Sequence, residues 1–94
     1  MVDLAQTSIE FRAEVFSDGD VYVALCPELN VSSFGPTPQK AKEALKEAIA
    51  AFVEGCHELG TLEEVLQEAG FSKQGQKWVG RTPLAQERLT ARVS

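Results

Sequence analysis

The chain has 94 residues, a net charge of −5 at pH 7 and 44% apolar residues, which suits one modest domain with a single core. No stretch reaches the roughly 20 apolar residues that a membrane-spanning helix needs. The first residues, MVDLAQTSIEF, lack the basic region and apolar run of a secretory signal. These absences lead us to expect a cytoplasmic protein.

The charge is unevenly distributed along the chain. Residues 1–72 carry 13 acidic and 4 basic side chains, a balance of −9, whereas residues 73–94 carry five basic side chains and one acidic one, a balance of +4. An acidic body repels nucleic-acid backbones and attracts basic proteins. The basic tail could contact nucleic acid, a partner protein or the acidic body of its own chain.

Two strands joined by a hairpin are expected near the start of the chain. TSIEFRAEVF, residues 7–16, alternates apolar and charged side chains with the period of a half-buried strand. Asp18-Gly19 predicts a tight turn into VYVALC, residues 21–26. Because this second run is apolar on both faces, we expect it to be central or covered on both sides, and Pro27 breaks it.

A third short strand is expected over residues 29–34, where Gly35-Pro36 ends it, and a long helix follows. Thr37 is placed to cap this helix by accepting a backbone N–H, and Pro38 suits the first helical position because it lacks an N–H. Apolar residues then recur every three or four positions and form one stripe: Ala41, Ala44, Leu45, Ala48, Ile49, Phe52, Cys56 and Leu59. The stripe predicts a helix of about 21 residues, about 31 Å long, that packs across one face of the sheet.

A second, shorter helix is expected next. Thr61 and Glu64 have the spacing of a capping box, and Gly70 supplies a C-terminal stop. SKQGQK, residues 72–77, is polar and is expected to be a loop, whereas KWV, residues 77–79, can begin a strand.

The basic tail allows more than one interpretation. Trp78 among basic residues is a combination found in nucleic-acid binders, but an ordinary strand with alternating charge looks the same, and we favour the ordinary strand. Four later residues follow a period-2 pattern that Glu87 interrupts, namely Ala85, Leu89, Ala91 and Val93. An extra strand is therefore one outcome for the tail, and a frayed or helical end is the other.

The cysteines and the single histidine are weak candidates for chemistry. Cys26 and Cys56 stand 30 residues apart, which is not the spacing of a zinc or redox motif, so we interpret both as buried thiols. His57 adjoins Cys56, but neighbouring residues on a helix project about 100° apart, so we do not expect a nucleophile and its base.

The acidic residues near the first hairpin are the remaining candidates. Glu14, Asp18 and Asp20 could in principle hold a hard cation through their oxygens. Turns are rich in aspartate for conformational reasons alone, and we prefer that interpretation. We therefore assign no catalytic, cofactor-binding or metal-binding residue.

One ordered set of motifs can be compared with a known family. A D-G hairpin leads into VYVALCPEL, followed by VSSFG and then by TPQKAKEALKEAIAAF. This order resembles the HicB-like antitoxin family of type II toxin–antitoxin systems over about residues 9–70. The resemblance implies a partial ribonuclease-H-like α+β fold and a partner toxin, a small basic ribonuclease with a double-stranded-RNA-binding-like fold.

Together these patterns predict an α+β fold in which an antiparallel sheet of three to four strands carries a long helix on one face. Residues 1–72 would form the HicB-like domain and residues 73–94 a basic tail. Well-known family members carry a C-terminal DNA-binding module, but this tail is too short and irregular for a helix-turn-helix, so no separate DNA-binding domain is expected.

The expected function is that of a non-enzymatic module, without cofactor, that binds a small basic toxin and self-associates as a homodimer or higher oligomer through an exposed sheet edge. Two alternatives stay open. One is a degenerate metal-dependent nuclease with Glu14, Asp18 and Asp20 as its ligands. The other is a regulator that contacts nucleic acid through the basic tail.

Overall fold

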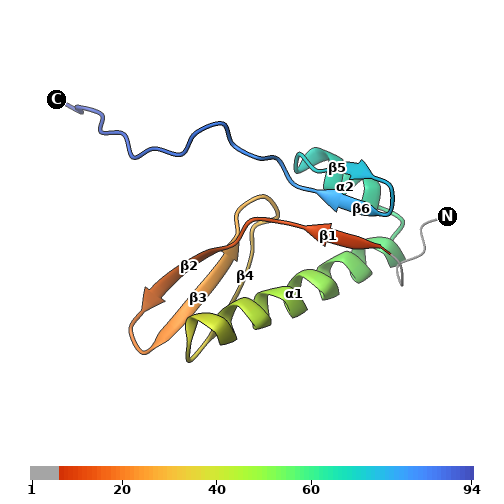
Figure 1. Ribbon diagram of the computed structural model, residues 1–94, viewed down its shortest axis with the longest axis horizontal. Helices are drawn as coiled ribbons and strands as arrows, with labels where there is room; N and C mark the ends of the chain where they lie inside the picture. The colour runs from red at the N-terminus through yellow and green to blue at the C-terminus, as the bar shows by residue number, and fades with distance from the viewer. Residues whose placement is uncertain (1–6) are drawn as a thin grey trace.

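The computed structural model describes residues 7–94, which form two three-stranded sheets, one long helix and one short helix (Figure 1). In chain order the elements are β1 (Ser8–Glu10), β2 (Glu14–Asp18), β3 (Val21–Cys26), β4 (Val31–Gly35), α1 (Pro38–Glu58), α2 (Leu62–Glu68), β5 (Ser72–Gln74) and β6 (Lys77–Val79). The predicted α+β class, with a long helix over an antiparallel meander of β2, β3 and β4, is confirmed.

The core lies between α1 and one face of the meander. α1 crosses β4 and β3 and contacts β2 least (Figure 1). The apolar stripe predicted for α1 is buried at four positions, and Val53, which the stripe did not include, is also buried. Leu59, the last residue of the predicted stripe, lies past the end of the helix and is exposed. From β3, Ala24 and Cys26 meet the helix and are fully buried. All five residues of β2 are exposed, so this strand is an edge that the helix leaves uncovered.

The turn between β4 and α1 requires a close approach of two backbones. A Cβ added at Gly35 would lie 2.8 Å from the Ala41 nitrogen and 2.8 Å from the Lys40 carbonyl carbon. The predicted cap forms, since the Thr37 hydroxyl accepts a hydrogen bond from the Lys40 N–H at 3.0 Å. The absent side chain of Gly35 therefore lets the first turn of α1 sit directly on the end of β4.

The prediction of one strand over residues 7–16 is wrong in one respect, because this segment forms two strands. β1 and β2 are separated by residues 11–13 and belong to different sheets. β2 pairs with β3, whereas β1 pairs in parallel with β6, with Ile9 opposite Trp78. Alternation of side chains indicates a strand but carries no information about its partner, so the bend between the two sheets was not predictable.

Two further local expectations are also wrong. The polar run at residues 72–77 is a hairpin, in which β5 pairs with β6 around Gly75 at φ 66°. β5 is exposed throughout, which explains its polar composition. The capping box does not form, because Thr61 makes no side-chain cap and its hydroxyl instead donates to the Cys56 carbonyl at 3.3 Å.

The boundary that we expect between the domain and the basic tail, after residue 72, falls inside β5. The folded body extends through β6. Trp78, on β6, is one of the most deeply buried residues of the core. Beyond it, the Gly80 N–H donates to the Glu10 carbonyl at 3.0 Å. Residues 80–94 then form neither helix nor strand, and the end of the chain leads away from the body (Figure 1).

No helix in the described residues is long and apolar enough to cross a membrane. The expectation that the chain lacks a secretory signal concerns its first residues, and residues 1–6 lie outside the described part.

Replacing Gly35 with alanine is expected to lower the free energy of unfolding by about 1–3 kcal/mol, because the new Cβ has to displace the backbone of α1. The matched control is Gly55→Ala within α1, where the new Cβ meets nothing within 4 Å. There the better helix propensity is expected to raise stability by about 0.5–1 kcal/mol. Urea unfolding measures both values, and changes of the same sign would contradict the close approach at Gly35.

Candidate functional site

The three acidic residues near the first hairpin do not form a metal site. Glu14 and Asp18 stand at the two ends of β2, which separates their backbones by about 13 Å at 3.3 Å per residue. Asp20 lies in the turn that follows. Among residues 7–94, no group of three or more His, Cys, Asp or Glu side chains is arranged to hold a metal ion. The ligand set that the nuclease alternative needs is therefore not assembled by the described residues.

The cysteines are buried free thiols, as predicted. Cys26 lies on β3 under the helix, and Cys56 lies on the buried stripe of α1. His57 follows Cys56 but lies off that stripe and is half-buried. The two neighbouring residues point in different directions, so they do not make a nucleophile and its base.

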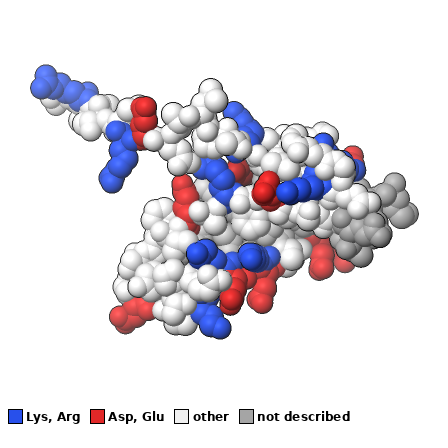
Figure 2. Space-filling model, in the orientation of Figure 1, with Lys and Arg blue, Asp and Glu red and all other residues white. Residues whose placement is uncertain are grey.

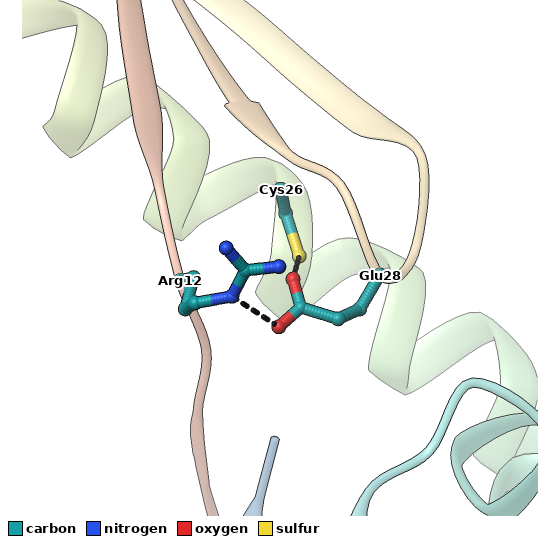
Figure 3. Close-up of polar contacts among 3 residues, drawn as sticks. All are labelled: Arg12, Cys26 and Glu28. Carbon is teal, nitrogen blue, oxygen red and sulfur yellow. Dashed lines mark hydrogen bonds and ion pairs between the residues drawn. The ribbon is translucent and has the colours of Figure 1, made fainter. Parts of the chain in front are cut away.

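A polar contact that the sequence did not indicate joins the segment after β1 to the turn after β3 (Figure 3). The Arg12 Nε donates to Glu28 Oε2 at 3.2 Å, and the Cys26 thiol donates to Glu28 Oε1 at 3.8 Å. The Glu28 side chain is only 8% exposed, whereas that of Arg12 is 39% exposed. Burial is the main cause that raises the pKa of the Cys26 thiol, and the Glu28 charge adds to it.

This contact also lies where the two sheets meet. A Cβ at Gly80 would be 3.3 Å from Glu28 Oε2 and 3.5 Å from the Glu10 carbonyl oxygen, so the end of β6 passes beside the same carboxylate. Only the Pro-Glu-Leu run after β3 could have signalled this position. The arrangement holds the chain together at its bend.

An open apolar surface lies on the face of the meander opposite α1. The register places Phe16 opposite Val23 and Val23 opposite Phe34, so their side chains cross the sheet in one row. Because Ala24 faces the helix, its neighbour Val23 faces away from it. Phe16 is 52% exposed and Phe34 is 68% exposed. We call these three residues the apolar row.

A second surface feature is a groove of about 270 Å³ between α1 and residues 9–13, which belong to β1 and the segment that follows it. Ala13 lines it from the strand side, and Lys42, Leu45 and Lys46 line it from the helix. A larger open groove of about 520 Å³ lies beside Arg12 and Glu28 and is bounded by residues 81–85. Neither groove gathers a set of groups that could hold a metal.

The first basic residues of the tail pair with the body of the protein. Lys73 lies 3.8 Å from Glu63 and Lys77 lies 3.7 Å from Glu10, so both lysines pair with the acidic body of their own chain. Trp78 is buried, which confirms the ordinary-strand interpretation and removes it as a stacking platform for bases. Figure 2 shows acidic and basic side chains next to one another along the edge of the body that α1 forms, and basic side chains at the end of the C-terminal segment.

Comparisons of the chain with protein-family models, curated proteins and solved structures found no match. The HicB-like resemblance therefore rests on the order of motifs quoted above and stays a hypothesis.

Replacing Arg12 with alanine is expected to lower the free energy of unfolding by about 1–3 kcal/mol, because the buried Glu28 carboxylate loses its cation. The control is Lys40→Ala, which removes a pair with Glu43 whose two side chains are more than half exposed. That change is expected to stay within about 0.5 kcal/mol. Urea unfolding measures both variants, and equal effects would show that Glu28 does not depend on Arg12.

Raising the pH above the ordinary thiol pKa of about 8.5 is expected to lower the stability. The folded-state pKa of Cys26 lies above its unfolded value, so the unfolded chain loses the proton first. The stabilisation that the protonated Cys26 thiol provides is complete below the pKa of this thiol in the unfolded chain. It declines as the pH rises toward the pKa of the thiol in the folded chain. Unfolding free energies between about pH 7 and 10 should fall less steeply in Cys26→Ala than in the parent. Parallel curves would contradict the assignment.

Proposed function

We propose that this protein is a non-enzymatic protein-binding module of the HicB-like antitoxin kind, which neutralises a small basic ribonuclease by covering its active surface. The observation that carries the proposal is the apolar row, which lies open on the face of the meander opposite α1. The motif order quoted for the resemblance supplies the identity of the partner class.

The apolar row has the chemistry of an interface centre. Aromatic side chains are enriched in the centres of protein–protein interfaces and often dominate the binding free energy. Phe16 and Phe34 stand on the two outer strands with Val23 between them, so a partner laid across the sheet would contact all three. Contiguous exposed apolar surface of this kind commonly marks a place where another molecule binds.

The charge of the body favours a basic partner. Residues 1–72 carry a balance of −9, and the acidic residues of α1 and of the first turn of α2 lie at the surface. Opposite net charges speed the encounter of two proteins and disfavour partners of the same sign. The partner expected from this charge is the same as the one that the resemblance implies.

A toxin that cleaves RNA would be met in the cytoplasm, so we place the protein there. We also expect the protein to self-associate, because the meander ends on both sides in edge strands, β2 and β4.

The test begins with the gene next to the one that encodes this chain. We expect it to encode a short, basic, histidine-containing protein that is retained by this chain in a pull-down, and whose RNA cleavage this chain suppresses. Phe34→Ala is expected to weaken the complex by about 10- to 100-fold, as loss of a central aromatic contact does.

The matched control for that variant is Leu59→Ala, which removes another exposed apolar side chain at the far end of α1. It should leave the affinity unchanged, and circular dichroism should show both variants folded. Failure of the parent proteins to associate, or equal weakening by both variants, would contradict the proposal.

A further inference from the structure

The end of the chain lacks a partner for its apolar side chains. We call residues 81–94 the C-terminal arm. Leu84, Leu89 and Val93 are at least 84% exposed, and the end of the arm leads away from the body (Figure 1). It helps to raise the Cα radius of gyration to 15.4 Å, above the value of about 12 Å for a compact chain of this length.

Part of the arm has the side-chain pattern of a half-buried strand. Over residues 88–93, Arg88, Thr90 and Arg92 alternate with Leu89, Ala91 and Val93. The structure gives this segment no strand pairing within the chain. A strand pattern without a partner in its own chain points to an edge on another molecule.

β2 offers such an edge. Its described pairing is with β3 alone, and α1 leaves it uncovered. On the side that faces away from the helix it carries Glu14, Phe16 and Asp18, whereas Val15 on the helix side is still 37% exposed. The other edge of the meander, β4, has no charged residue.

We propose that residues 88–93 of one copy add to β2 of a second copy as an antiparallel strand, so that two copies exchange their arms. Within this antiparallel pairing charge sets the register, because Arg88 and Arg92 have the same spacing as Glu14 and Asp18. With Arg88 opposite Asp18, Arg92 falls opposite Glu14, and cross-strand pairs of opposite charge stabilise a sheet.

The same register also places the apolar side of the arm correctly. Leu89 falls opposite Ser17 and Ala91 opposite Val15, on the side of the sheet that α1 occupies, and Val93 falls beside Ala13, the residue before β2. Ala13 lines the groove of about 270 Å³ between residues 9–13 and α1. Val93 would therefore lie at this groove, which Leu45 of α1 also lines.

The geometry favours a second copy over the arm's own β2. The bond from Gly80 to Glu10 starts the arm near the end of β1. To bring its own Arg88 beside Asp18, the arm would have to run nearly extended along β2, about 23 Å for the seven steps from residue 11 to residue 18. To pair with its own β2 as an antiparallel strand, the arm would then have to reverse its direction near residues 86–89, Gln-Glu-Arg-Leu, which hold no typical turn residue.

The inference rests on the self-association in the proposed function and is independent of the basic partner. Its test is the molar mass of the full chain in solution, by sedimentation or by light scattering during gel filtration. The parent is expected to be a dimer of the 10.2 kDa chain. The double variant Arg88→Glu with Arg92→Glu should dissociate at least ten-fold more readily, and so should Glu14→Lys with Asp18→Lys.

Mixing the two double variants supplies the matched control. In the mixed dimer each arm meets a β2 of opposite charge, so a heterodimer of the parent's size should form. A general effect of net charge would not restore association in this way. Circular dichroism should show both double variants folded.

Disulfide formation tests the register. Asp18→Cys chains mixed with Arg88→Cys chains should form cross-linked heterodimers on oxidation. Glu14→Cys chains mixed with Arg88→Cys chains should not, because a parallel strand would be needed to bring those positions together. Cross-linking of the second mixture alone would overturn the antiparallel register.

The remaining outcomes separate the hypotheses. A monomeric parent would overturn both self-association and arm exchange. A dimer unaffected by either double variant would overturn arm exchange and leave self-association standing. If reversing Arg88 and Arg92 leaves the dimer intact but abolishes retention on RNA at low salt, the arm contacts nucleic acid and arm exchange is wrong.

Discussion

The whole structure depends on the crossing of one helix over β4 and β3. That crossing requires a glycine at position 35, since any Cβ there would meet the backbone of α1. The helix then buries Ala24 and Cys26 of the central strand under its apolar stripe. A single helix in a chain of this size covers one face of a small sheet, and here it covers two strands better than the third. The outer face of the meander and the edge strand β2 are left open for that reason.

The second sheet closes the other end of the body and depends on residues that are distant in sequence. β1 comes from the start of the described chain and β5 and β6 from the other side of both helices. Where the two sheets meet, Glu28 lies beside Arg12, Cys26 and the end of β6. A nearly buried carboxylate needs such partners, and the bend between β1 and β2 is held by them. The polar contacts found here are therefore structural, and the candidate surfaces lie elsewhere.

Charge distinguishes the two parts of the C-terminal region. Lys73 and Lys77 lie on the small sheet and pair with carboxylates of the body. These pairs reduce the repulsion among the negative charges of the body. Arg88 and Arg92 lie beyond that sheet, on a segment with an apolar side of its own. An acidic body with open apolar faces and a basic amphipathic arm is chemically complementary to itself as well as to a basic partner. The two proposals use adjoining surfaces, the apolar row for the partner and the β2 edge for a second copy, and these surfaces meet at Phe16.

The sequence by itself determined the local elements that have strong local signals. The stripe and cap of α1, the hairpin at Asp18-Gly19, the burial of both cysteines and the strand at Trp78 all follow from periodicity and from turn or cap chemistry. Only the tertiary structure decided that residues 7–16 divide between two sheets, that the polar run at 72–77 is paired, and that Glu28 lies against Arg12. Those features depend on which distant segments meet, and the alternation of side chains along one strand is the same whichever partner the strand takes.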